Sequence, residues 1–276
     1  LAAYLAHLIF KIFIRKKVMT RIKPHHVHLI CNAKYHDTDF ARAELVKLFS
    51  EHDDLGVSIS QDYSDFHKYT DSDLLVTYTC DLSPAEEEVE VLRSFLNKGG
   101  KWFGLHGTNA LIEFVGEKQI VDGIEIPGKT DTPNKNPQLM ELLGSRFIAH
   151  PANMTIKVKV SDKNHPLTRG LDDFEIFEEP YYCEFSDGVN VLLESRYTDS
   201  ADSYVSSSWE EDIPRPQMYL HDVGRGNVLY LMFGHCRGKY DMRPLMDECP
   251  VDKGGWDSEI FYELLRRGIK WGIGTI

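Results

Sequence analysis

Hydrophobic and polar positions alternate regularly along the first 115 residues of the chain. Short apolar runs rich in β-forming residues predict strands at 27–31, 57–60, 74–80 and 101–105. Apolar residues at helical spacing, with Ser83 as a helix cap and Gly99 as a helix end, predict helices at 39–51, 83–98 and 110–115. Because strands and helices alternate, the pattern predicts a parallel sheet with right-handed crossovers.

Strand-like patterns dominate the second half of the chain. Residues 117–136 are rich in Gly, Pro, Thr, Lys and Asp, so we expect a surface excursion over the carboxyl edge of the sheet. Alternation at 155–160 predicts a half-buried strand at an edge. Further strands are predicted at 189–193, 218–223 and 227–233, and helices at 137–143 and 256–272. With no repeat and no linker, residues 19–276 are predicted to form one α/β domain.

The first eighteen residues differ from the rest. Residues 1–14 are almost entirely apolar, and an Arg-Lys-Lys run follows them. The run is too short and too interrupted to span a membrane, and it lacks the order of a signal peptide. We therefore expect no stable membrane insertion. Residues 1–18 are interpreted as an extension outside the domain, from a mis-extended gene start or a truncated leader, with a membrane-surface helix as the alternative.

Composition excludes some classes of protein. The 276 residues are 42% hydrophobic and 27% charged, with a formal net charge of −12, which is typical of a soluble globular chain. A nucleic-acid binder would present a basic face, so no nucleic-acid partner is expected. The cysteines are scattered, odd in number and without a CxxC pair, which argues against a disulfide framework and favours a reducing, cytoplasmic compartment.

The segment 101–107 carries the main functional signal. It is predicted to be a buried strand that ends in a tight turn, with Gly104 and Gly107 on either side of the turn leaving room for a close backbone. Such a turn lifts one residue to the carboxyl end of the sheet, where open α/β folds bind ligands. Here that residue is His106, which can bind a metal, transfer protons or hydrogen-bond a hydroxyl.

Other candidate groups follow other predicted strands. His36 and His235 both come shortly after strand ends, so they are predicted to converge with His106 at one edge of the sheet. The acidic pair Glu178 and Glu179 lies among aromatic residues, where an unpaired charge would be costly. His150 and His165 each precede a proline and are typical of packed turn histidines. The sequence contains no GxSxG, GxGxxG or Walker motif, so nucleotide binding is not indicated.

Several motifs resemble the trehalose-utilisation (ThuA-like) family. They are YHD at 35–37, GLHG at 104–107, LLGSRFIAHP at 142–151, DKNHPLTRGL at 162–171, FEIFEEPYY at 174–182, GRGNVLYLMFGH at 224–235 and the closing RRGIKWGIG. The resemblance implies a class I glutamine amidotransferase-like fold, a flavodoxin-like three-layer α/β sandwich with a mostly parallel central sheet. It also implies a role in catabolism of trehalose and related disaccharides, partly through keto-sugars.

The resemblance also bears on the site. Amidotransferases of this fold place a cysteine at the turn where this chain has His106, so glutamine hydrolysis is not expected. The family's acidic–Glu–x–Tyr motif maps onto Glu178, Glu179 and Tyr181, and a Glu stands at the first position, where Asp is common. This departure makes Glu178 a weaker candidate than Glu179.

We therefore predict a carbohydrate-active hydrolase or lyase with a small sugar substrate. His106, Glu179 and His235 are the predicted catalytic residues, and His36, Tyr181 and Tyr182 the predicted substrate-binding residues, with Tyr182 and Trp209 stacking on sugar faces. Two alternatives stay open. One is a metal-dependent hydrolase or lyase that binds zinc or a similar divalent ion through two or three of His36, His106, Glu179 and His235. The other is a non-catalytic sugar-binding or regulatory module. The sequence is also compatible with a homo-oligomer.

Overall fold

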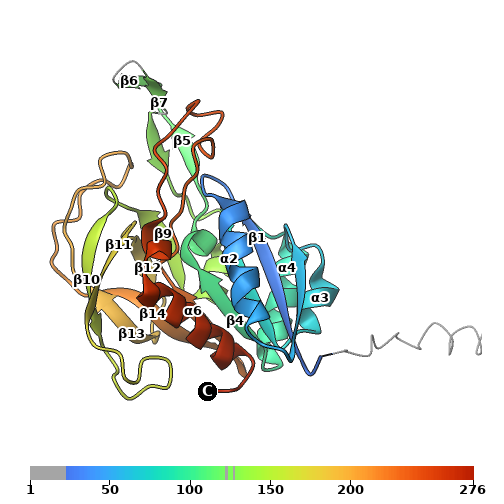
Figure 1. The fold of residues 1–276 in the computed structure, drawn as a ribbon. Coiled ribbons are helices and arrows are strands. Elements are labelled where there is room, and N and C mark those ends of the chain that lie inside the picture. The colour runs from blue at the N-terminus through green and yellow to red at the C-terminus, as the bar shows by residue number, and fades with distance from the viewer. Residues whose placement is uncertain (1–22, 122–123, 127) are drawn as a thin grey trace, which may run out of the picture.

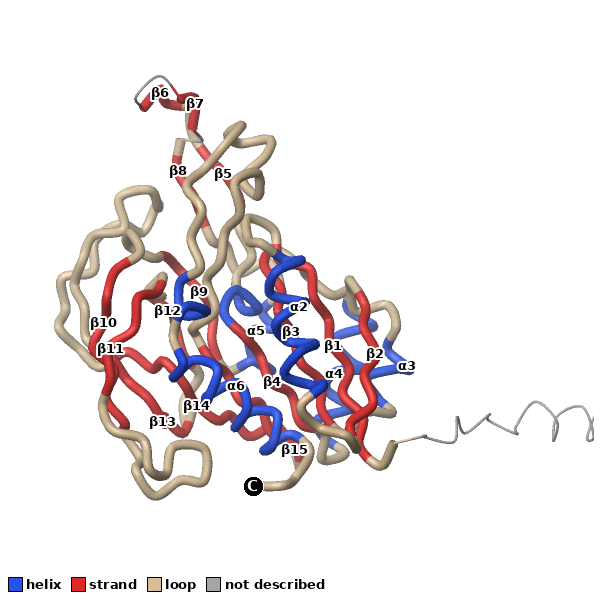
Figure 2. Tube along the Cα trace, viewed as in Figure 1, coloured by secondary structure: helices blue, strands red, loops and turns tan. Residues whose placement is uncertain are grey.

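A mixed β-sheet forms the centre of the fold (Figures 1 and 2). The computed structural model describes residues 23–121, 124–126 and 128–276, so the interpretation of residues 1–18 falls outside the described residues. Within them the sheet has nine strands, in the spatial order β11 (Phe174–Glu178), β10 (Met154–Val160), β13 (Asn190–Ser195), β14 (Arg215–Val223), β15 (Gly226–Leu231), β4 (Lys101–Leu105), β3 (Leu74–Cys80), β1 (His25–Ala33) and β2 (Leu55–Ser60).

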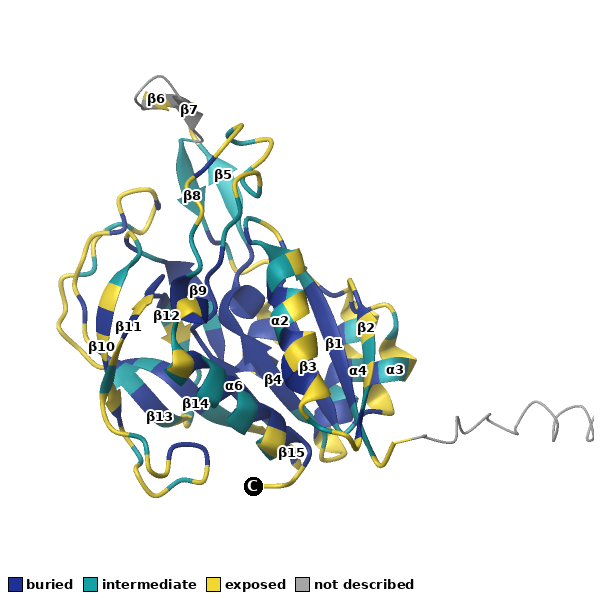
Figure 3. Ribbon diagram, in the orientation of Figure 1, coloured by how far each residue is buried: buried dark blue, intermediate teal, exposed yellow. Residues whose placement is uncertain are grey.

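The half of the sheet from β15 to β2 is parallel and covered on both faces. Helices α2 (Thr38–Ser50) and α6 (Glu259–Gly272) contact each other on one face, and α3 (Phe66–Thr70), α4 (Glu86–Asn97) and α5 (Pro137–Leu143) form a connected layer on the other. Strand β3 is buried along its whole length, as expected for a strand between two helical layers (Figure 3). The predicted α/β sandwich is thus confirmed.

The half from β11 to β15 is antiparallel, so the sheet as a whole is mixed. The sequence pattern alone favoured parallel pairing because its clear strand–helix alternation lies in the first 115 residues. Strand β10 was expected at an edge, but it lies between β11 and β13, and β11 forms the edge instead. A separate antiparallel pair, β9 (Ser145–Ala149) and β12 (Tyr182–Phe185), lies beside the main sheet.

The segment after β4 differs from its prediction. The expected helix at 110–115 is wrong: a 3-10 turn, η1 (His106–Asn109), is followed by extended chain and strand β5 (Glu113–Val115). The side chain of Asp81 explains the difference, because its Oδ1 accepts the amide of Ile112 at 3.0 Å and holds this stretch away from helical hydrogen bonding.

The predicted surface excursion contains strands of its own. Strand β5 pairs with β8 (Lys129–Asp131), and β6 (Gln119–Val121) pairs with β7 (Ile124–Ile126). Figure 1 shows these pairs projecting away from the central sheet. The loop prediction was therefore right about position and wrong about the lack of regular structure.

Two helix starts are shifted along the chain. Helix α4 begins at Glu86 instead of the predicted Ser83 cap, because the Glu88 carboxylate accepts the amide of Ala85 at 2.7 Å. Helix α6 begins at Glu259, after a 3-10 turn η2 (Gly254–Asp257).

Two further expectations concern the chain as a whole. All five cysteines are free thiols, which agrees with the absence of a disulfide framework. Within the described residues, no helix has the length and apolar character needed to cross a bilayer.

Helix α6 packs very closely on β4. A Cβ added to Gly268 would lie 2.2 Å from Cε1 of Phe103, a fully buried ring. We expect Gly268→Ala to lower the free energy of unfolding by about 1–3 kcal/mol, because the ring must shift in a well-packed core. Urea denaturation followed by tryptophan fluorescence measures the change. Lys270→Ala on the exposed side of the same helix is the control, with an expected effect within about 0.5 kcal/mol. Equal effects of the two substitutions would show that Gly268 is not a close contact.

Candidate functional site

The turn after β4 is as closely packed as its glycines predicted, and its backbone is also strained. His106 has a φ of 46°, in the left-handed region that L-residues rarely adopt. A Cβ on Gly107 would lie 2.9 Å from Cβ of Cys80, and one on Gly104 would lie 2.8 Å from the ring of Tyr230. The hydroxyl of Tyr230 donates to the carbonyl of His106 at 2.6 Å. Close packing on both sides therefore holds the imidazole of His106 in place.

Positive φ angles of non-glycine residues are concentrated near this turn. Among the described residues they occur at Tyr35, Asp81 and His106, which follow β1, β3 and β4. These three strands are neighbours in the parallel half of the sheet. Backbone strain costs free energy and tends to persist where function requires it. The strain thus marks the same edge of the sheet that the sequence pattern singled out.

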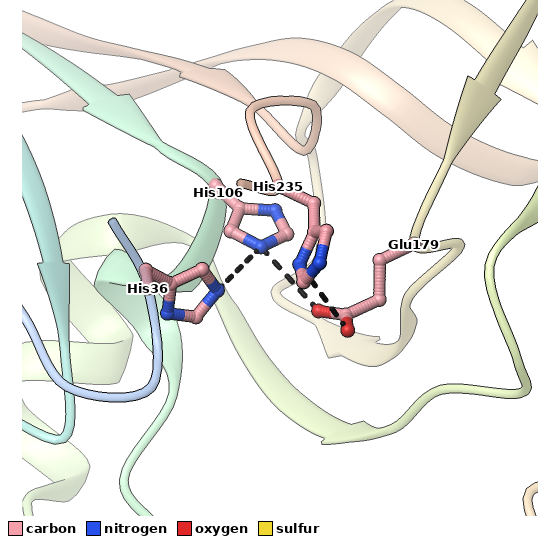
Figure 4. A group of neighbouring side chains, drawn as sticks. All are labelled: His36, His106, Glu179 and His235. Carbon is pink, nitrogen blue, oxygen red and sulfur yellow. Dashed lines mark hydrogen bonds and ion pairs between the residues drawn. The ribbon is translucent and has the colours of Figure 1, made fainter. Parts of the chain in front are cut away.

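The imidazoles of His36 and His106 meet at this edge (Figure 4). Their Nε2 atoms are 3.0 Å apart, and both side chains are buried. The Nε2 of His106 is also 2.9 Å from the hydroxyl of Tyr181 and 3.4 Å from Oε2 of Glu179. The ring of Tyr181 stacks on that of His106 with centroids 4.6 Å apart.

His235, which follows β15, completes the group. Its Nδ1 lies 3.3 Å from Oε1 of Glu179, and the residue is 0% exposed. Neither ring nitrogen of His235 makes a hydrogen bond within the part of the chain that the structure describes. His36, His106, Glu179 and His235 each offer one ligand atom, and these atoms lie within 4.8 Å of one another.

Backbone carbonyls fix the tautomers of two of these histidines. The Nδ1 of His36 lies 2.7 Å from the carbonyl oxygen of Lys34, and the Nδ1 of His106 lies 2.9 Å from that of Met232. A carbonyl can only accept, so each Nδ1 must carry the proton and donate it. In the neutral imidazoles, both Nε2 atoms therefore carry a lone pair that faces the centre of the group.

Burial and charge set the protonation states. Burial lowers the pKa of His36 well below its usual 6.5, and the neighbouring His106 and His235 add to this effect. Burial acts to raise the pKa of Glu179, but charge interactions with His150 and His235 hold it well below 4.5. For His235 burial acts to lower the pKa, and the Glu179 carboxylate outweighs it and raises the pKa. The group therefore combines a carboxylate anion with a neutral His36.

Glu178 has a different role from Glu179. Its carboxylate accepts the amides of Glu179, Gly234, His235 and Gly255 at 2.9–3.1 Å. These bonds join the end of β11 to the segment that follows β15, although β10, β13 and β14 lie between these strands in the sheet. The antiparallel half of the sheet therefore curves back, and Glu178 holds the backbone that carries Glu179 and His235.

Some residues near the group were not predicted. His150 was expected to be a packed turn histidine, but its Nε2 lies 3.2 Å from Oε1 of Glu179. A guanidinium nitrogen of Arg237 is 3.7 Å from the same oxygen. The pairing of β9 with β12 brings His150 beside Tyr181, since Ala149 lies opposite Tyr182. Only this long-range pairing identifies His150, because the His-Pro sequence by itself is typical of turns.

Tyr182 lies outside the group, contrary to the predicted substrate-binding role. It is fully buried, and its ring stacks on Trp209 with centroids 4.4 Å apart and the planes 4° from parallel. Its hydroxyl donates to the carbonyl of Asp199. The guanidinium of Arg215 lies over the Tyr182 ring, with Cζ 4.5 Å from the ring centroid. Tyr181 stands just before β12 and faces His106, whereas Tyr182, the first residue of β12, faces Trp209. The stacking capacity of Tyr182 and Trp209 is used inside the protein.

A cavity of about 560 Å³ opens beside the group. His36, Glu179 and Tyr181 reach its surface, while His106 and His235 are 1% and 0% exposed. The rest of its wall is largely aromatic and charged, and includes Tyr35, Phe114, Lys129, Phe147, His150, Tyr204 and Arg237. The volume lies within the range of about 300–1,000 Å³ that is common for small-molecule sites.

Solved structures share this fold. A ThuA-like protein from Bacteroides uniformis ATCC 8492 has a TM-score of 0.60 and 16% identity, over 92% of this chain and 93% of that one. A ThuA-like protein from Parabacteroides merdae ATCC 43184 has a TM-score of 0.60 and 19% identity, over 92% and 91%. A cold-adapted β-galactosidase from Rahnella sp. R3 has a TM-score of 0.52 and 11% identity, over 92% of this chain and 32% of that one.

These likenesses define the class: the chain is an α/β protein with a mixed, partly parallel central sheet, and it shares the fold of ThuA-like structures. Residues 125–248 match the model of the ThuA family, which is described as trehalose utilisation. No curated protein matches the chain. The family match agrees with the resemblance that the motifs indicated, and it covers a little under half of the chain.

Proposed function

We propose that the chain is an enzyme of carbohydrate catabolism, a hydrolase or lyase that acts on a trehalose-related disaccharide or a keto-sugar derived from it. The observation that carries this proposal is the convergence of His36, His106, Glu179, Tyr181 and His235 next to a cavity of about 560 Å³. The residues come from distant parts of the chain, and such a concentration of buried titratable groups beside a cavity is typical of a reaction centre.

The proposed centre offers the groups that acid–base chemistry on a sugar requires. Glu179 can accept a proton from a sugar hydroxyl or from water, because charge interactions keep its carboxylate ionised. The hydroxyl of Tyr181 can donate a proton, and burial raises its pKa well above 10, which keeps it protonated. His106 and His235 lie against Glu179 and can stabilise the charge that develops there.

The cavity wall suits a polar ring with apolar faces. Tyr35, Phe114 and Phe147 provide aromatic surface for a sugar face, while Arg237 provides hydrogen-bond donors for hydroxyls. These residues take the role that the sequence had assigned to Tyr182 and Trp209. A cysteine does not occupy the turn after β4, so glutamine hydrolysis is not proposed.

The direct test is turnover on a panel of α- and β-linked glucose disaccharides and their 3-keto derivatives. Product formation is followed by chromatography and mass spectrometry, and binding by calorimetry on the same samples. We expect product from at least one member of the panel, with loss of product in Glu179→Gln. Saturable binding without product across the panel would instead identify a sugar-binding module.

The neighbouring tyrosines give a matched pair of variants. Tyr181→Phe removes the hydroxyl that faces His106 but keeps the stacked ring, so we expect turnover to fall by about 100-fold or more. Tyr182→Phe removes a hydroxyl that faces Asp199, so we expect turnover near the wild-type value and a stability loss of about 0.5–1.5 kcal/mol. Steady-state kinetics and thermal melts distinguish the two. Similar kinetics for both variants would contradict the proposed role of Tyr181.

A further inference from the structure

The contact between His36 and His106 requires a positive charge. Both Nδ1 atoms donate to backbone carbonyls, so both Nε2 atoms carry lone pairs, and these atoms are only 3.0 Å apart. Two lone pairs at this distance repel each other unless a cation or a proton lies between or beside them. The single hydroxyl of Tyr181 can donate to His106 but leaves His36 without a donor on this side.

The distances within the group fit one shared metal ion. Ligand atoms at about 2.0–2.2 Å from a zinc ion lie about 2.9–3.5 Å from one another, for bond angles between a right angle and a tetrahedral one. The Nε2 atoms of His36 and His106 are 3.0 Å apart. The separations from Glu179 are 3.4 Å from Oε2 to His106 and 3.3 Å from Oε1 to His235. The whole set of ligand atoms spans up to 4.8 Å, so the outermost side chains would move inward when they close around one ion.

Unsatisfied polar atoms point to the same ligand. Oε1 of Glu179 has ion-pair contacts with His235 at 3.3 Å and His150 at 3.2 Å. Within the described residues, however, neither this oxygen nor either ring nitrogen of His235 makes a hydrogen bond. Buried polar atoms without partners are costly, and they are uncommon unless a ligand or water completes them. Figure 4 shows the carboxylate of Glu179 beside the rings of His106 and His235, with dashed contacts to both. A divalent ion here would satisfy the lone pairs and also balance the buried carboxylate charge.

The surroundings resemble those of known kinds of metal site. Histidine ligands usually donate their other ring nitrogen to a carbonyl or carboxylate, as His36 does to Lys34 and His106 does to Met232. Glu178 fixes the backbone on both sides, since it accepts the amides of Glu179 and His235. Imidazole and carboxylate donors without a thiolate suit zinc and neighbouring first-row divalent ions.

We propose that His36, His106, Glu179 and His235 together bind one divalent transition-metal ion, with zinc as the first candidate. The inference deepens the proposed function by adding a cofactor to the same centre. Only the catalytic role of the ion rests on the proposed function; its binding does not. Binding engages the lone pair of His106, which leaves the hydroxyl of Tyr181 free to face the sugar in the cavity. Such an ion can polarise a sugar oxygen or lower the pKa of a bound water.

The test uses the full chain and zinc alone, without sugar. Protein stripped with a chelator and dialysed is titrated with Zn²⁺ by calorimetry, and bound metal is counted by elemental analysis. We expect one ion per chain and a rise in Tm of about 5–10 °C at a zinc concentration 100-fold above Kd. Mn²⁺, Co²⁺ and Ni²⁺ in the same assay rank the ions that the site accepts.

Variants show where the ion binds. His36→Asn and Glu179→Gln should each weaken zinc binding by more than about 100-fold, because each removes a ligand. His67→Asn removes a histidine on the exposed surface and should leave the affinity unchanged. Circular dichroism of each stripped variant checks that it is folded. Failure of the wild-type chain to hold one ion, or equal binding by all variants, would overturn the inference and leave a shared proton between the two imidazoles as the explanation of their contact.

The two proposals can fail separately. Turnover of a sugar by stripped protein that binds no zinc would support the proposed function and reject the metal site. Stoichiometric zinc that His36→Asn abolishes, with no product from any sugar of the panel, would support the site and reject the proposed substrate class.

Discussion

Replacing His106 with asparagine should lower kcat/KM by about 100- to 10,000-fold while the protein stays folded. Asparagine tolerates a positive φ better than most residues, so the backbone at φ 46° can be kept. The substitution removes the Nε2 atom that contacts His36, Glu179 and Tyr181. Loss of a positioned acid–base group has an effect of this size.

Stability separates this result from a simple folding defect. The variant loses the hydrogen bond from Nδ1 to the carbonyl of Met232, which contributes about 0.5–1.5 kcal/mol. We therefore expect the unfolding free energy to fall by no more than about 2 kcal/mol, measured in urea beside the kinetic assay. A collapse of the melt would identify His106 as a structural residue, and full turnover in a folded variant would place the reaction centre elsewhere.

Replacing Glu178 with glutamine should have the largest effect on stability. The carboxylate accepts four backbone amides, and a glutamine side chain would turn its NH₂ group towards two of them. Each buried donor left without an acceptor costs about 1–3 kcal/mol, so the free energy of unfolding should fall by about 2–6 kcal/mol. This is a large share of the total for a typical domain, which is about 5–15 kcal/mol.

The next residue provides the control. Glu179→Gln leaves every backbone amide bonded but removes the negative charge that His150 and His235 face, so we expect a loss of stability that is smaller than that of Glu178→Gln. The pair should therefore show opposite profiles: Glu178→Gln loses stability, and Glu179→Gln loses turnover. Denaturation curves and initial rates measured on the same preparations decide this. Equal stability of the two variants would contradict the anchoring role of Glu178.

The sequence predicted the parts of the site that local geometry determines. Gly104 and Gly107 predict a close approach to the backbone. In the structure the residues that approach are Tyr230 at Gly104 and Cys80 at Gly107. The convergence of His36, His106 and His235 could be expected because the strands before them run parallel and end at one edge. Both predictions need only short stretches of sequence and the rule that parallel strands place their carboxyl ends at one edge of the sheet.

The rest depends on contacts between distant segments. The helix predicted at 110–115 does not form because Asp81, thirty-one residues before Ile112, takes its amide. Whether Tyr181 or Tyr182 faces the site depends on the register of β12 against β9, which no local pattern reveals. The position of Glu179 likewise depends on the curvature of the antiparallel half of the sheet, which the backbone hydrogen bonds of Glu178 maintain. No local pattern distinguishes this structural role of Glu178 from the role of its neighbour.

The projecting pair of β5 and β8 has a consequence for specificity. Phe114 and Lys129 from this pair line the cavity, whereas His106 and His235 follow strands of the central sheet. Part of the cavity wall is thus built separately from the cluster of imidazoles. Insertions or deletions in this arm would change the size and shape of the ligand that the cavity accepts without moving an imidazole. Related proteins would then differ in ligand specificity while keeping the same histidine cluster.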